Sequence, residues 1–364
     1  MTPFAQLCLL IRCALGTEPE PVRAIGAVKL DGEALAVLAF RHRVAAFLRR
    51  LAVDPEIGPR LPGELSDSLI VAYAANRERN HALLAQLADV TRLLNARAVE
   101  PVLLKGAGRL VDGVFADPAE RFLLDLDLLV PRHRLGCATR ALIDAGYAFS
   151  EREARLAREF HHLPSLWRED TLARIELHRT AVSHWHDRLL PTDAIHRNAP
   201  PCDIGGFRAR LPAPVDGLMH LVVHGQSQHH RLLVGSVLLS EVVELALVRR
   251  RHGDGLVDHT FELARNRGFG TGFASFLRVC EIVTGERIGQ GKDRPLLAGP
   301  LARRALWQQE HRRMRAPGRF LAWIAGGALV VHRHPSVKAR FPGRLAERSF
   351  YANRWHDFRR VLTR

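Results

Sequence analysis

The stretch RFLLDLDLLV, residues 121–130, limits most strongly what this chain can fold into. Its apolar residues are typical of a buried β-strand, yet two aspartates stand inside it. Residues two apart in a strand project from the same face, so the side chains of Asp125 and Asp127 point together. Two carboxylates this close resist burial unless a cation lies between them. The residues that fill the opposite, buried face of this predicted strand are Leu124, Leu126 and Leu128.

A third acid, Glu176, repeats the pattern in the stretch ARIELHRT, where Ile175 and Leu177 flank it. If this second predicted strand pairs with the first, three carboxylates converge from two strands. Hard divalent cations with oxygen ligands, Mg²⁺ above all, suit such a set. The arrangement is typical of two-metal phosphoryl-transfer sites, in which one ion holds the phosphates and the other activates the attacking hydroxyl.

The rest of the chain predicts an α+β fold in which helices enclose a small mixed sheet. Helical periodicity dominates the first hundred residues, with a break between Pro55 and Gly63. A short strand after Pro101, the KGAG turn and a helical stretch to Phe115 then precede the aspartate strand. A helix over 134–145, a strand at Tyr147–Ser150 and a hairpin within SLWREDTLARIELHRT follow, and a proline-rich hinge at Pro200–Pro214 leads back to helices. The expected divisions are an N-terminal helical region at 1–96, an α/β core at 97–200 and a C-terminal helical region with a basic tail at 201–364.

Three motifs, VLLKGAGRL, RFLLDLDLLV and RIELHRT, together resemble the nucleotidyltransferase family of the DNA polymerase β superfamily. More narrowly, they are similar to a large bacterial branch that carries LKG, then RxxxDxDLLV, then an acid before Leu-His. The later stretches LMHLVVHG and LSEVVEL also fit that branch, so the resemblance covers roughly residues 70–285. It implies a polymerase-β-like mixed sheet with flanking helices, embedded between N- and C-terminal helical regions.

The resemblance also implies a reaction and a set of roles. Asp125 and Asp127 would hold two Mg²⁺ ions, and Glu176 would complete the site and assist deprotonation of the acceptor. ATP or another NTP would give up its NMP moiety to a hydroxyl or phosphate acceptor, and pyrophosphate would be released. The residues expected to contact the nucleotide's phosphates are Lys105, Gly106 and Arg121, and those expected to support the site or face the acceptor are His178 and His162.

Composition leaves two other function classes open. The net charge of +15 is concentrated in residues 303–364, which hold fifteen Lys/Arg against three acids. A basic tail of this kind suits nucleic acid, although a solvated helical surface in an arginine-rich protein would look the same. The second alternative is a non-catalytic, antitoxin-like regulator that retains the fold.

Several other classes are disfavoured by the sequence. Five scattered cysteines form no CxxC pair, which argues against a disulfide framework and fits a reducing cytoplasm. The apolar N-terminus reads as an amphipathic helix, and the run from Phe320 to Val331 is too short to span a bilayer. His220 and His224 have the spacing of an HExxH zinc site, but Leu221 stands where the glutamate belongs. We therefore expect a soluble protein in which these histidines pack within the helical half.

Overall fold

The computed structural model describes residues 1–149, 162–183, 186–289 and 294–311. The expectations for the basic tail beyond residue 311, for the apolar run at 320–331 and for Ser150 lie outside these residues. Within them, no helix is both long and apolar enough to cross a membrane.

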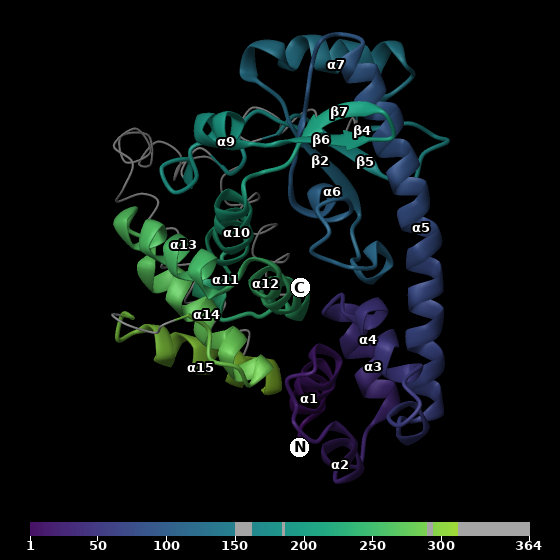
Figure 1. Cartoon of the computed structure of the whole chain (residues 1–364), viewed down its shortest axis with the longest axis vertical. Coiled ribbons are helices and arrows are strands. Elements are labelled where there is room, and N and C mark those ends of the chain that lie inside the picture. The colour runs from purple at the N-terminus through teal and green to yellow at the C-terminus, as the bar shows by residue number, and fades with distance from the viewer. Residues whose placement is uncertain (150–161, 184–185, 290–293, 312–364) are drawn as a thin grey trace, which may run out of the picture.

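The chain has an α+β fold, as predicted, with a seven-stranded mixed sheet among the described residues. The strand order is β3-β4-β5-β2-β1-β7-β6. Figure 1 shows α7 on one side of this sheet and α6 on the other. The strands are β1 (Val102–Leu103), β2 (Asp125–Leu129), β3 (Ala148–Phe149), β4 (Leu166–Trp167), β5 (Arg174–His178), β6 (Pro201–Ile204) and β7 (Phe207–Arg210).

Helices precede the sheet, interrupt it and follow it. Those before it are α1 (Pro3–Leu15), α2 (Pro21–Gly26), α3 (Gly32–Arg41), α4 (Ala45–Ala52), the 3₁₀ turn η1 (Gly58–Arg60) and α5 (Gly63–Asn95). Those between strands are α6 (Lys105–Arg109), η2 (Pro118–Glu120), η3 (Arg132–Arg134), α7 (Leu135–Asp144) and α9 (Thr192–Asn198). Those after it are α10 (Pro214–Val222), the π-helical η5 (Val223–Gln228), α11 (Arg231–Val234), α12 (Leu239–His252), α13 (Asp254–Asn266), α14 (Gly270–Thr284) and α15 (Ala298–Glu310).

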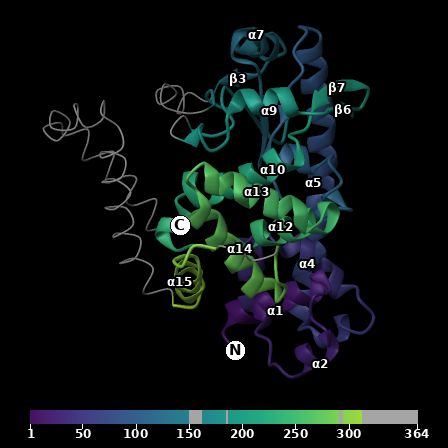
Figure 2. The same cartoon turned by 60° about the vertical axis from the view of Figure 1, so that its left-hand side comes forward.

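Helix α5 joins the two hydrophobic cores of the molecule. It has 33 residues, which at the rise of an α-helix corresponds to roughly 50 Å. Its first turns bury Leu65 and Leu69 in a core of helices, and its last turns bury Leu87 and Leu94 against the sheet. Figures 1 and 2 show α5 running along one side of the molecule from the N-terminal helices to the sheet.

The N-terminal and C-terminal helices share one core, which the sequence did not predict. Residues of α1, α3 and α4 belong to the same buried cluster as residues of α10, α12 and α14. The chain therefore returns to its first helices after completing the sheet, and Figure 2 shows α1 close to α14 and α15. The sheet is thus supported from one end by helices that are far apart in the sequence.

Three local expectations were wrong. The KGAG segment is the start of α6 rather than a turn, and the helix ends at Arg109 instead of Phe115. Beyond its end, Gly113 has φ +70°, a backbone conformation that a helix does not contain. Leu124 precedes β2 and is 49% exposed, whereas Leu126 and Leu128 are fully buried as expected. The stretch expected as a hinge at Pro200–Pro214 contains the hairpin of β6 and β7.

This hairpin extends the sheet past the expected boundary at residue 200, because β7 pairs in parallel with β1. Its turn is Gly205–Gly206, both at positive φ, and the carboxylate of Asp203 accepts a hydrogen bond from the Gly206 N–H. Two glycines at positive φ suit the tight turn of a hairpin. The Gly205–Gly206 pair is the sequence feature that indicated a hairpin here, but the neighbouring prolines favoured the interpretation as a hinge.

Candidate active site

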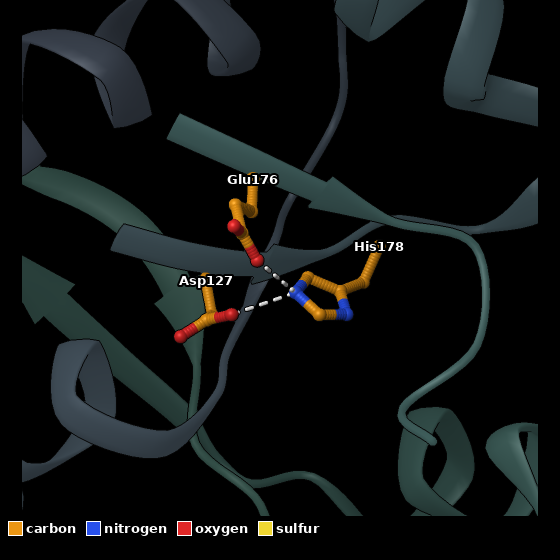
Figure 3. A group of neighbouring side chains, drawn as sticks. All are labelled: Asp127, Glu176 and His178. Atoms are coloured by element: carbon orange, nitrogen blue, oxygen red, sulfur yellow. Dashed lines mark hydrogen bonds and ion pairs between the residues drawn. The ribbon is translucent and has the colours of Figure 1, made fainter. Parts of the chain in front are cut away.

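Strands β2 and β5 bring two of the predicted acids together. They pair in parallel, and the register places Asp127 opposite Glu176. The side chain of His178, at the end of β5, joins them from the same face. One ligand atom from each of Asp127, Glu176 and His178 lies within 4.8 Å of the other two, as Figure 3 shows. This grouping of two carboxylates and an imidazole could hold a metal ion.

Asp127 is almost completely enclosed, with 2% of its side chain exposed. Its Oδ1 atom accepts hydrogen bonds from Lys105 Nζ and from His178 Nε2, both at 2.7 Å. Burial alone would raise the pKa of Asp127, but the charge of Lys105 and the hydrogen bond from His178 outweigh burial and lower it. The carboxylate is therefore ionised at neutral pH and available to a cation.

Lys105 reaches Asp127 from the first residue of α6. Its backbone has φ +48°, a conformation that is rare for residues other than glycine and costs free energy. Burial would lower the pKa of Lys105, but the carboxylates of Asp127 and Glu176 raise it overall, so the side chain stays an ammonium ion. Next to it, Gly106 packs so closely that a Cβ atom would lie 2.9 Å from Leu123 Cβ. The LKG motif thus fixes α6 tightly against the segment before β2.

Asp125 is the first residue of β2, two residues before Asp127, and it pairs with Arg174 of β5. Burial raises the pKa of Asp125 to about 6, with further contributions from Asp127 and Glu176, and Lys105 opposes the rise. The charges of the other two acids therefore act on Asp125. It does not belong to the tight group of three ligand atoms, where His178 takes the place that the sequence assigned to this aspartate.

The two histidines expected near the site contact its acids directly. His178 is fully buried, and its Nε2 atom lies 3.5 Å from Glu176 Oε2. Burial would lower the pKa of His178, but hydrogen bonds to Asp127 and Glu176 raise it. His162 pairs with His178 in an isolated β-bridge, and its Nε2 atom lies 3.7 Å from Glu176 Oε2. Glu176 is therefore held between two imidazole rings, an arrangement that the ELH spacing indicated only for His178.

Arg121, expected at the nucleotide's phosphates, instead forms an ion pair within the protein. Its Nη2 atom lies 3.0 Å from Glu244 Oε2, and Arg109 Nε lies 2.8 Å from Glu244 Oε1. Glu244 comes from α12 and is buried. Burial would raise the pKa of Glu244, but Arg121 and Arg109 lower it. The sequence could not predict this contact, because more than a hundred residues separate the partners.

His220 lies deep in the helical half near the site, where its ring meets that of His224 edge-on at 5.7 Å. The two histidines therefore pack within the helical half, as predicted. Burial lowers the pKa of His220 to about 3, and the charges of Lys105 and His178 contribute to the decrease. Its Nε2 atom has no hydrogen-bond partner among the described residues.

We expect acid to destabilise the protein through His220. The pKa of a histidine in an unfolded chain is near 6.5, so below that pH the unfolded chain binds a proton that the folded protein does not. The contribution to stability is complete above about pH 6.5 and falls by up to about 1.4 kcal/mol per pH unit toward pH 3. Urea unfolding of the wild type and of His220→Leu at pH 7.5, 6.5 and 5.5 measures this. The wild type should lose stability more steeply than the variant, and equal slopes would contradict the assignment.

A family model supports the relationship that the motifs suggested. The model of a family described as uncharacterised nucleotidyltransferase matches residues 29–285. The match begins in the N-terminal helices and ends at α14, so it covers the whole sheet and helices on both sides of it. No curated protein and no solved structure matches the chain significantly.

Proposed function

Because the chain belongs to the family of uncharacterised nucleotidyltransferases, we propose that it transfers the NMP moiety of an NTP to an acceptor. ATP is our first candidate for the donor, and the acceptor group is a hydroxyl or a phosphate. An acceptor oxygen attacks the α-phosphorus, the bond from that phosphorus to the β-phosphate oxygen breaks, and pyrophosphate leaves. When the acceptor is a hydroxyl, its proton passes to a base in the site; a phosphate oxygen anion attacks without losing a proton.

The observation that carries this proposal is the meeting of Asp127 and Glu176 on adjacent strands beside His178. These ligand atoms fit a divalent cation, since oxygen atoms of two carboxylates and a nitrogen atom of an imidazole lie close together. The carboxylate of Asp127 also stays ionised. Asp125 would extend the oxygen ligands, so that two Mg²⁺ ions could be held. When bound, such ions offset the charge of the triphosphate and activate the acceptor hydroxyl.

The protein's own residues supply the remaining roles in this proposal. Lys105 adds a fixed positive charge next to Asp127, and α6 holds it there through the close contact of Gly106 with Leu123. Glu176 is the base that accepts the proton of the acceptor hydroxyl. His178 and His162 orient its carboxylate from two sides. Catalysis would come mainly from positioning and from charges that are in place before the substrate binds.

Isotope transfer tests the proposed reaction. The purified protein is incubated with Mg²⁺, a cell extract and each NTP, labelled either at the α-phosphate or at the γ-phosphate. We expect a labelled product from the α-label only, and no such product from Asp125→Asn or Asp127→Asn. Transfer of the γ-label would show a kinase instead. A product that both variants still form would show that the acids are not part of the reaction.

A further inference from the structure

Arg43 is a cation without a carboxylate partner among the described residues, and the charge of Asp125 acts on it. It lies in the short link between α3 and α4, and its side chain is exposed. Within the part of the chain that the structure describes, its guanidinium forms no hydrogen bond or ion pair. The group lies over the ring of Phe122, with Arg43 Cζ 5.9 Å from the ring centroid. Its backbone has φ +58°, the left-handed region that few residues other than glycine adopt.

The neighbouring cations, in contrast, are already paired with carboxylates. Lys105 is bound to Asp127, and Arg121 and Arg109 are bound to Glu244. Arg231 forms an ion pair with Glu241. The residues that the motifs assigned to the phosphates, Lys105 and Arg121, therefore have much of their charge offset within the protein.

Arg79 is a second cation beside Phe122, and it has no carboxylate partner among the described residues. It projects from α5, and its Nε–H donates a hydrogen bond to the backbone oxygen of Leu123 at 3.1 Å. Its Cζ atom also lies 5.9 Å from the ring of Phe122. Two guanidinium groups, one from the α3–α4 link and one from α5, thus approach one aromatic side chain, to which a cation is attracted electrostatically.

This cluster adjoins the acids on the side of Asp125. Phe122 stands three residues before Asp125, and the exposed Leu124 between them leaves the segment open to solvent. Although the residue is exposed overall, its guanidinium group is partly buried, and this burial lowers the pKa of Arg43. The charges of Arg121 and Arg231 lower it further, and those of Asp125 and Glu241 oppose the shift. The field of Arg43 thus reaches Asp125, whereas His178 and His162 approach Glu176. Arginines without a carboxylate partner thus contact the segment that leads into Asp125, and the imidazoles contact Glu176.

We propose that Arg43 and Arg79, which both approach the ring of Phe122, bind the β- and γ-phosphates of the nucleotide. The proposal rests on the function proposed above. A polyphosphate brings more negative charge than a metal site alone offsets, and the planar guanidinium group matches phosphate oxygens with two parallel hydrogen bonds. The nucleotide's tail then lies toward the N-terminal helical region, and the acceptor enters on the side of His178 and His162.

Calorimetric titration with inorganic tripolyphosphate, in the presence of EDTA, tests this assignment without requiring turnover. Arg43→Gln and Arg79→Gln should each weaken binding at least about tenfold, as expected for the loss of a hydrogen bond to a charged group. Arg77→Gln removes the same charge from an exposed position on α5 and should bind like the wild type. Wild-type affinity in both Arg43→Gln and Arg79→Gln would overturn the proposal.

The variant Arg43→Gly separates binding from folding. Because glycine adopts positive φ without strain, this variant should melt at or above the temperature of the wild type and still bind tripolyphosphate more weakly. Undiminished binding by a folded Arg43→Gly variant would overturn the proposal. If the wild type binds tripolyphosphate through these arginines but transfers no label, the proposed reaction fails and the assignment of Arg43 and Arg79 stands.

Discussion

Replacing Asp127 with asparagine is expected to reduce nucleotidyl transfer by at least about a thousandfold. Asp127 is the buried carboxylate to which both Lys105 and His178 are hydrogen-bonded. It is the register partner of Glu176 on the neighbouring strand β5. Asparagine keeps the shape of the side chain but removes the charge that would bind the cation. The several kcal/mol of transition-state stabilisation that a bound metal supplies correspond to at least this factor. Initial rates of α-label transfer at saturating Mg²⁺ measure the effect.

The matched control for this variant is Asp67→Asn, which makes the same chemical change at an exposed position on α5. It should transfer label at the wild-type rate. Because the variant leaves Lys105 without its charge partner, the fold of Asp127→Asn is checked by circular dichroism. We expect the spectrum of the wild type. A folded Asp127→Asn variant with more than a tenth of wild-type activity would contradict the role of Asp127.

The second large effect is expected on stability. Glu244→Gln should lower the free energy of unfolding by about 3–5 kcal/mol, because it leaves the buried guanidinium group of Arg121 without a carboxylate and leaves Arg109 with Asp112 alone. The ion pairs of Glu244 join α12 to α6 and to the segment before β2. Breaking them therefore weakens the attachment of the C-terminal helices to the site. Urea unfolding followed by circular dichroism measures the change.

Glu262→Gln is the control for this stability effect. Glu262 also pairs with an arginine, Arg265, but both side chains are nearly half exposed. Exposed pairs contribute at most about 1 kcal/mol, so this variant should unfold close to the wild type. Equal effects of Glu244→Gln and Glu262→Gln would show that the buried pairs do not stabilise the fold more than a surface pair.

The sequence predicted the two strands that carry the acids well because their signal is local. Alternation within β2 placed two acids on one face, and the ELH stretch indicated that a second strand presents Glu176 in the same way. Only the pairing of β2 with β5 had to be assumed, and the structure confirms it. The family match supports the same conclusion from the chain as a whole.

The remainder of the site depends on contacts that no local pattern records. The position of Glu244 between two arginines and the place of His178 on Asp127 result from the packing of distant elements. The apolar periodicity over Leu35–Leu51 predicted helix but could not show that Arg43 interrupts it with a left-handed backbone. In the same way, the prolines near residue 200 outweighed the Gly205–Gly206 turn signal and concealed two strands.

Divalent-cation binding tests the central claim most directly, because everything else in the proposal depends on acids from β2 and β5 acting together. Mn²⁺, which occupies magnesium sites and is visible by electron paramagnetic resonance, is titrated into the wild type and into Glu176→Gln, and Mg²⁺ is then added in competition. We predict that the wild type binds Mn²⁺, that Mg²⁺ displaces it, and that Glu176→Gln binds it at least about tenfold more weakly. A wild type that binds no Mn²⁺, or a Glu176→Gln variant that binds it as tightly as the wild type, would contradict the account.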